Sequence, residues 1–339
     1  MKIDKYGTTP AGADMTAYTL EGANGAFLQV LDYGGKVVRL CVPDKSGACE
    51  NVAMSLSFAK PGFGGSLIGR YANRISGGRF TIDGVAYATP TNIAPEGMPA
   101  LLHGGAAGFH DRLWSARPFQ GADGSDALEL SYTSPDGEGG FPGTLSVTVV
   151  YTFTKTNVWR IEWTATTDKA TPVNFTHHVY FNLSGERRAP IDDNRLTLAA
   201  PAITPTGAGQ CTTGEIRPVA GTDFDFTSPA VIGSRMGGLY DHNFVLASQT
   251  GALAFAAKVE DPASGRVVET WTTEPGIQFY AGGALHDGLK DQFERPLFPF
   301  AGFALETQRH PDSVNHPNFP ESVLRPGETF RSVTEYRFL

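Results

Sequence analysis

The chain has 339 residues, of which 41% are hydrophobic and 18% are charged. This composition allows a sizeable core and excludes an intrinsically disordered chain. The formal net charge is −8 at pH 7, so we expect neither nucleic acid nor an anionic membrane as a partner. Neutral or cationic small molecules fit this charge better.

Two features of the sequence indicate a soluble protein. No segment approaches the roughly 18 consecutive apolar residues of a membrane-spanning helix, and the start, MKIDKYGTTPAGAD, lacks the apolar core of a signal peptide. We therefore expect a cytoplasmic protein, although a periplasmic protein whose signal peptide has been removed would have the same sequence. The three cysteines have no disulfide or Cys-x-x-Cys spacing and are expected to be structural thiols. The sequence makes no prediction of the oligomeric state.

Alternation of apolar and polar residues, which is typical of half-buried strands, recurs along the chain. It marks, in chain order, residues 26–34, 78–89, 127–134, 145–154, 159–163 and 329–339. Asp83-Gly84 predicts a type I′ turn, and Thr156-Asn157 separates two strands that we expect to form a hairpin.

Helical periodicity is nearly absent, whereas glycine (40) and proline (23) are frequent. No linker divides the chain into two compositions, and no repeat of fixed period is present. We predict one all-β domain over residues 1–339, built from large, mostly antiparallel sheets that stack face to face.

The segment THHVYFNL (176–183) places two histidines side by side. Neighbours in a strand point to opposite faces, so only one of them enters a given cleft. His178 would share a polar face with Tyr180 and Asn182, whereas His177 would lie on the mostly apolar face. We predict His178 as the site residue; the alternative is that both are ordinary half-buried histidines.

A carboxylate interrupts the apolar segment 302–308, GFALETQ. Phe303 and Leu305 would lie on one face of this strand, and Glu306 and Gln308 on the other. Burial would raise the pKa of Glu306 and make it a better base near neutral pH. The alternative is a glutamate that faces solvent.

Two glycine-containing segments carry polar side chains that suit ligand-binding loops. GRYANRI (69–75) holds Asn73 and Arg74, and LLHGGAAGFHDRLW (101–114) holds His103. Neither segment contains a phosphate-binding motif. The histidine pairs 310/316 and 177/178 lack the spacing of a zinc site, so we expect no metal.

These segments resemble the aldose 1-epimerases, the galactose mutarotases. GRYANRI, LLHGG, THHVYFNLSG, YDHNFVL (240–246) and ALETQRHPDSVNHPNFP occur in the order and spacing of that family, from about Gly34 to the C-terminus. The resemblance implies a β-supersandwich fold and a cofactor-free reaction that interconverts the α and β anomers of free aldoses such as galactose or glucose.

The resemblance also implies roles for individual residues. It places the proton donor to the ring oxygen at His178 and the base at the anomeric hydroxyl at Glu306. The sugar would be held by Asn73, Arg74, His103 and Asp241, with weaker contacts from Tyr180 and Gln278. The family usually has asparagine where this chain has His177, and a histidine or an aromatic residue where it has Arg309. These two differences bear on the charge distribution and sugar preference of the pocket.

A carboxylate and an imidazole supply a base and an acid near neutral pH. We expect their mutual attraction to favour an ionised pair. Two other classes of function remain. A glycoside hydrolase would use a carboxylate pair, conceivably Asp241 and Glu306, and a non-catalytic sugar-binding module could share the fold. A sugar-phosphate epimerase would need clustered cations, which the matched segments lack.

Overall fold

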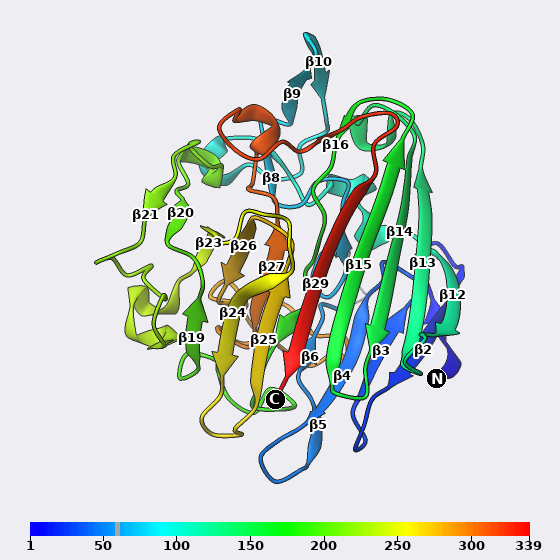
Figure 1. The fold of residues 1–339 in the computed structure, drawn as a ribbon, viewed down its shortest axis with the longest axis vertical. Coiled ribbons are helices and arrows are strands. Elements are labelled where there is room, and N and C mark those ends of the chain that lie inside the picture. Colours follow the sequence, from blue (N-terminus) through cyan, green and yellow to red (C-terminus); the bar gives the residue numbers. More distant parts are fainter. Residues whose placement is uncertain (58–61) are drawn as a thin grey trace.

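Strands dominate the computed structural model, which describes residues 1–57 and 62–339. They form three large antiparallel sheets and several two-stranded ones (Figure 1). Within the described residues the helical segments are all 3-10 turns of three residues: η1 (Pro95–Gly97), η2 (Gly105–Ala107), η3 (Phe109–Asp111), η4 (Glu138–Gly140), η5 (Ala208–Gln210), η6 (Ile232–Ser234), η7 (Met236–Gly238) and η8 (Ser313–Asn315). None of them is long and apolar enough to cross a membrane.

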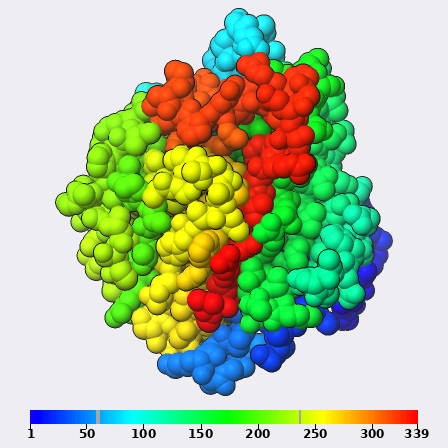
Figure 2. Space-filling model, in the orientation of Figure 1, coloured from blue at the N-terminus to red at the C-terminus, as the bar shows by residue number. Residues whose placement is uncertain are grey.

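The largest sheet has nine strands. Their order is β12 (Ser115–Gln120), β13 (Asp126–Ser134), β14 (Leu145–Phe153), β15 (Val158–Thr167), β29 (Phe330–Phe338), β25 (Val267–Thr272), β24 (Ala254–Glu260), β19 (Arg195–Leu198) and β22 (Ala230–Val231). The alternating residues of β14 are buried on one side and partly exposed on the other. The outer face of the sheet forms a continuous surface from the yellow strands through red β29 to the green strands (Figure 2).

Two further sheets cover the inner face of the nine-stranded sheet (Figure 1). The five-stranded sheet has the order β1 (Lys2–Thr8), β2 (Asp14–Glu21), β3 (Phe27–Leu31), β4 (Val37–Pro43) and β5 (Cys49–Asn51). The seven-stranded sheet has the order β21 (Arg217–Pro218), β20 (Ala202–Thr204), β23 (Asp241–Val245), β26 (Gly276–Tyr280), β27 (Phe303–Gln308), β18 (Tyr180–Phe181) and β6 (Ala53–Met54). One large core cluster joins residues of all three sheets, and each buried Val, Leu, Ile or Phe side chain contributes roughly 1.5–3 kcal/mol.

Four two-stranded sheets complete the fold. They pair β9 (Arg79–Ile82) with β10 (Val85–Ala88), β8 (Arg74–Ser76) with β11 (Ala100–Leu102), β7 (Leu67–Ile68) with β17 (Thr176–His177), and β16 (Thr171–Pro172) with β28 (Val323–Leu324). In the β9–β10 hairpin, Asp83 and Gly84 have φ values of 51° and 82°, as a type I′ turn requires.

Most strand predictions are confirmed, including the hairpin of β14 and β15, in which Phe153 faces Trp159. The prediction of one continuous strand over THHVYFNL is wrong. The segment contains the short strands β17 and β18, and His178 and Val179 between them belong to neither. The chain leaves β7 after His177 and joins β27 and β6 at Tyr180. The two short strands therefore belong to different sheets: β17 to the two-stranded sheet with β7, and β18 to the seven-stranded sheet.

Alternation in the seven-stranded sheet decides which side chains face the pocket. In β27, Phe303 and Leu305 belong to the large core, as predicted, while Glu306 lies on the opposite face. Gln278 of β26 pairs directly with Glu306, and Asn243 of β23 pairs directly with Gln278. Directly paired residues share a face, so one polar face runs across three strands.

Candidate active site

A cavity of about 300 Å3 opens over this polar face. It is lined by Phe63, Asn73, Arg74, Leu102, His103, His178, Gln210, Asp241, Tyr280, Ala284 and Glu306. Six of the residues selected from the sequence are among them: Asn73, Arg74, His103, His178, Asp241 and Glu306. The volume and the many polar groups suit a small hydrophilic ligand.

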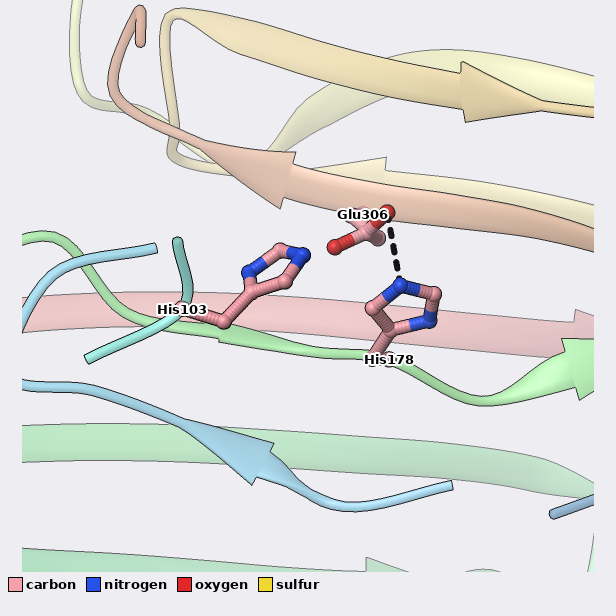
Figure 3. Close-up of side chains that lie close together, drawn as sticks. All are labelled: His103, His178 and Glu306. Carbon is pink, nitrogen blue, oxygen red and sulfur yellow. Dashed lines mark ion pairs between the residues drawn. The ribbon is translucent and has the colours of Figure 1, made fainter. Parts of the chain in front are cut away.

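His178 and Glu306, which both line the cavity, face each other (Figure 3). His178 Nε2 lies 3.7 Å from Glu306 Oε1, and the two side chains are 9% and 2% exposed. His178 comes from the link between β17 and β18, and Glu306 from β27. Glu306 Oε2 is buried and forms no hydrogen bond to the described residues.

His103 approaches the same point from the loop after β11 (Figure 3). Its ring lies edge to face with that of His178, with 5.1 Å between ring centroids. The backbone N–H of Asn73 donates to His103 Nδ1 at 3.1 Å, which places the ring proton of neutral His103 on Nε2. The next residue, Gly104, has a φ of 78°, and a Cβ there would lie 2.1 Å from the carbonyl oxygen of Gly69. Only glycine therefore allows this turn.

Arg74 contacts three other residues of the cavity lining. Its Nη2 donates to Gln210 Oε1 at 2.7 Å and lies 3.9 Å from Asp241 Oδ2. Its Nη1 donates to Asn73 Oδ1 at 3.4 Å. The side chain of Asp241 is 45% exposed, so it can accept hydrogen bonds from a ligand while it stays next to the guanidinium.

Two residues selected from the sequence lie behind the pocket wall. The ring of Tyr180 packs against His178, with 5.0 Å between centroids, and belongs to a small apolar cluster with Met54 and Ala304. Gln278 is 3% exposed, and its Nε2 donates to Asp241 Oδ1 at 2.6 Å. Both residues therefore support groups that line the cavity.

Burial dominates the protonation of the central pair. It lowers the pKa of His178 to about 4, against the opposing effects of a backbone hydrogen bond and of Asp241. It raises the pKa of Glu306 well above its usual value, and the Asp241 carboxylate raises it further. Both shifts favour uncharged side chains. These shifts run against the expectation of an ionised pair, and desolvation is the largest cause of both.

His103, His178 and Glu306 each offer a potential metal ligand, and the three atoms lie within 4.8 Å of one another. The hydrogen bond from Asn73 to His103 Nδ1 does not fit a metal, because neutral His103 then carries its proton on Nε2 and presents a donor to the pocket. Binding a cation there would require this backbone bond to break. The residues thus suit recognition of hydroxyl groups better than metal coordination.

The two differences from the usual family sequence lie outside the cavity lining. His177 points into the core, where its ring packs against Trp159 with 4.9 Å between centroids. Burial lowers its pKa to about 3. Arg309 donates to the backbone carbonyl of Glu321 and lies over Phe330, 5.5 Å from the ring centroid. Neither side chain lines the pocket.

Sequence reasoning missed several residues of the lining. Phe63, Leu102, Tyr280 and Ala284 shape the apolar part of the wall, but side chains of these types are common in any core and give no signal by themselves. Gln210 reaches the pocket from η5 and has a φ of 57°. Its glycine-rich surroundings, GAGQ, were the one feature that could have indicated a ligand-binding loop.

Comparison with known proteins agrees with this geometry. The family model described as aldose 1-epimerase matches residues 16–337. Galactose mutarotase from Rattus norvegicus is 36% identical, with 98% of this chain and 97% of the relative covered. Aldose 1-epimerase from Escherichia coli strain K12 is 34% identical, with 97% of each chain covered.

Solved structures show the same fold. The aldose epimerase homologue from C. elegans superimposes with a TM-score of 0.85 at 25% identity, covering 95% of this chain and 98% of the other. The galactose 1-epimerase from Lactobacillus acidophilus superimposes with a TM-score of 0.84 at 24% identity, covering 100% of this chain and 98% of the other. The predicted all-β architecture of large antiparallel sheets is confirmed.

Proposed function

Because the chain belongs to the aldose 1-epimerase family, we propose that its pocket interconverts the α and β anomers of free aldoses such as galactose or glucose, with His178 and Glu306 as its acid and base. The observation that carries this proposal is the separation of 3.7 Å between Nε2 of His178 and Oε1 of Glu306, two buried side chains that line the cavity. One group can reach the ring oxygen of a bound sugar while the other reaches the anomeric hydroxyl.

The reaction conserves protons over a full cycle. In the charge state that opens the ring, the one proton of the pair is on His178. Glu306, as a carboxylate, takes the proton of the anomeric hydroxyl while the His178 imidazolium protonates the ring oxygen, and the C1–O5 bond breaks. The bond between C1 and C2 then rotates. On closure the two transfers run backwards onto the other face of the aldehyde, so the enzyme returns to its starting state without a cofactor.

The preference of the pocket for uncharged groups has a role in this cycle. Ring opening converts an imidazolium and a carboxylate into a neutral imidazole and a carboxylic acid. Burial favours this second pair, as the opposite pKa shifts of His178 and Glu306 indicate. The two proton transfers of ring opening therefore run towards the charge state that desolvation favours. Hydroxyl groups that donate to Glu306 would support the carboxylate when the sugar first binds.

We assign sugar binding to the remaining polar groups of the lining. Arg74 and Asp241 offer a charged donor and a charged acceptor for neighbouring hydroxyl groups. His103 offers an Nε2–H donor, and the amide of Gln210 stands at the rim beside Arg74. The cytoplasmic location, the single domain over residues 1–339 and the absence of a metal, a nucleic acid or a membrane partner stay predictions.

Polarimetry on freshly dissolved α anomers of galactose, glucose, xylose and arabinose tests the function. We expect the protein to accelerate the change in rotation of at least one of these sugars far beyond the uncatalysed rate. Nitrophenyl glycosides provide the contrast with a glycoside hydrolase. Release of nitrophenol with no acceleration of mutarotation would contradict the proposal.

A further inference from the structure

A chain of buried amide groups leads from Asp241 into the protein. Gln278 Nε2 donates to Asp241 Oδ1 at 2.6 Å, and Gln308 Nε2 donates to Gln278 Oε1 at 3.4 Å. Gln308 Nε2 also donates to Asn243 Oδ1 at 3.2 Å, and Asn243 Nδ2 donates to His310 Nδ1 at 3.2 Å. The four residues behind Asp241 are at most 3% exposed.

The register of the seven-stranded sheet brings these groups together. Asn243 of β23 lies directly opposite Gln278 of β26, and Gly276, two residues before Gln278, lies opposite Gln308 of β27. A Cβ on Gly276 would lie 2.8 Å from both Asn243 Oδ1 and His310 Nδ1. The missing side chain at position 276 thus makes room for the amide chain.

Each amide in the chain has a fixed orientation. The amide nitrogen of Asn243 can only donate, so His310 Nδ1 accepts, and the Asn243 oxygen turns towards Gln308. Gln308 therefore presents its NH2 group to both Asn243 and Gln278. Its own oxygen is buried and has no partner among the described residues. The Gln278 oxygen is taken by Gln308, which leaves the Gln278 NH2 group to face the Asp241 carboxylate.

We propose that Gln308 is a positioning residue for sugar binding, which acts through Gln278 to hold the Asp241 carboxylate in the orientation that receives sugar hydroxyls. This inference rests on the role of Asp241 in the proposed function. Asp241 is half exposed and next to Arg74, so without the Gln278 hydrogen bond it would be free to turn towards the guanidinium or the solvent. Holding it in place removes an ordering cost from sugar binding.

The test compares Gln308→Met with a matched control. Methionine keeps nearly the length and volume of glutamine but has no N–H donor. Gln292→Met is the control, because Gln292 is 6% exposed and its Nε2 also donates two hydrogen bonds, to the carbonyl oxygens of Val38 and Ala53. It does not line the pocket. Gln308→Met loses two buried hydrogen bonds. Gln292→Met loses three, because Gln292 Oε1 also accepts from the backbone N–H of Ser55 at 2.9 Å. We expect both variants to lower Tm.

Only the variant in the amide chain should weaken sugar binding. We expect Gln308→Met to raise the Kd for galactose, measured by ligand-observed NMR titration, by about tenfold or more, and Gln292→Met to leave it unchanged. In an Asp241→Ala background, Gln308→Met should change the Kd by less than about twofold, because its effect passes through Asp241. If Gln308→Met does not fold, Gly276→Ala is a second variant that should break the amide chain and raise the Kd. Position 276 lies outside the left-handed region, so alanine is compatible with the backbone there.

Three results would overturn the inference. One is an unchanged Kd in folded Gln308→Met, and another is an equal rise in Kd with and without Asp241. The third is wild-type protein that does not bind galactose or any other aldose, which would remove the role of Asp241 itself. Polarimetry on the same samples separates the two proposals, because protein that binds sugar without converting its anomers contradicts the proposed function while the Kd values still decide the role of Gln308.

Discussion

His177 and His178 are adjacent in the chain, yet their rings lie in different environments. The His177 ring packs against Trp159 in the core, and the His178 ring lies beside His103 in the pocket. We expect His178→Ala to lower kcat for mutarotation by at least about a hundredfold, as for the loss of a general acid. His177→Ala should lower it much less. Polarimetry on both folded variants checks this, and the reverse order of effects would exclude His178 as the acid.

Asp241 is assigned to binding and not to proton transfer. Asp241→Asn keeps the shape of the side chain but loses the charge that faces Arg74. We therefore expect KM for galactose to rise by about tenfold while kcat changes by less than about threefold. A collapse of kcat at constant KM would instead mark Asp241 as a catalytic carboxylate and favour the hydrolase alternative.

The pH dependence follows from the direction of the pKa shifts. The pair of His178 and Glu306 is active when it holds one proton. If Glu306 is already neutral, protonation of His178 leaves neither group able to act as the base. Burial lowers the pKa of His178 to about 4, so kcat/KM should stay level as the pH falls through 6.5, the ordinary histidine value, and should decline only near pH 4. The apparent pKa belongs to the pair and not to one residue. Circular dichroism at each pH confirms folding, and a decline centred near 6.5 would contradict the burial argument.

His177 also links stability to pH. Its pKa is about 3 in the folded protein and about 6.5 when unfolded. Above pH 6.5 it is neutral in both states; as the pH falls below 6.5, only the unfolded chain binds the proton, so the free energy of unfolding decreases. The slope is at most about 1.4 kcal/mol per pH unit.

His177→Asn removes the imidazole that binds this proton in the unfolded chain. In urea denaturation between pH 7 and 5, we expect its free energy of unfolding to fall less steeply than that of the wild type. His286→Asn, at an exposed histidine, is the control for loss of a surface histidine. Equal slopes for wild type and His177→Asn would mean that His177 is protonated in the folded protein.

The sequence predicted those parts of the fold that depend on local patterns. Alternation located β14, β15 and β29, and Asp83-Gly84 located a hairpin, because each is determined by neighbours in the chain. The break between His177 and Tyr180 was missed, since it arises from pairing with β7, β27 and β6, which are distant in sequence. Gln210 was missed for the same reason, because only the folded loop brings it to Arg74.

The protonation of the site also depended on burial that the sequence does not specify. Charge alone suggested an ion pair between His178 and Glu306. The structure encloses both groups so completely that desolvation becomes the largest cause of both pKa shifts. The resemblance to the aldose 1-epimerases selected the residues, but only their positions in space show which of them meet in the pocket.

The most direct test of the catalytic pair is Glu306→Gln, which keeps the shape of the side chain and removes the base. Exchange between the α and β anomeric protons of galactose at equilibrium is measured by magnetisation-transfer NMR, which reports turnover without a coupled enzyme. We expect folded Glu306→Gln to bind galactose and yet to lose at least about a hundredfold of the wild-type exchange rate. Near-wild-type exchange in this variant would contradict the account, because another residue would then have to be the base.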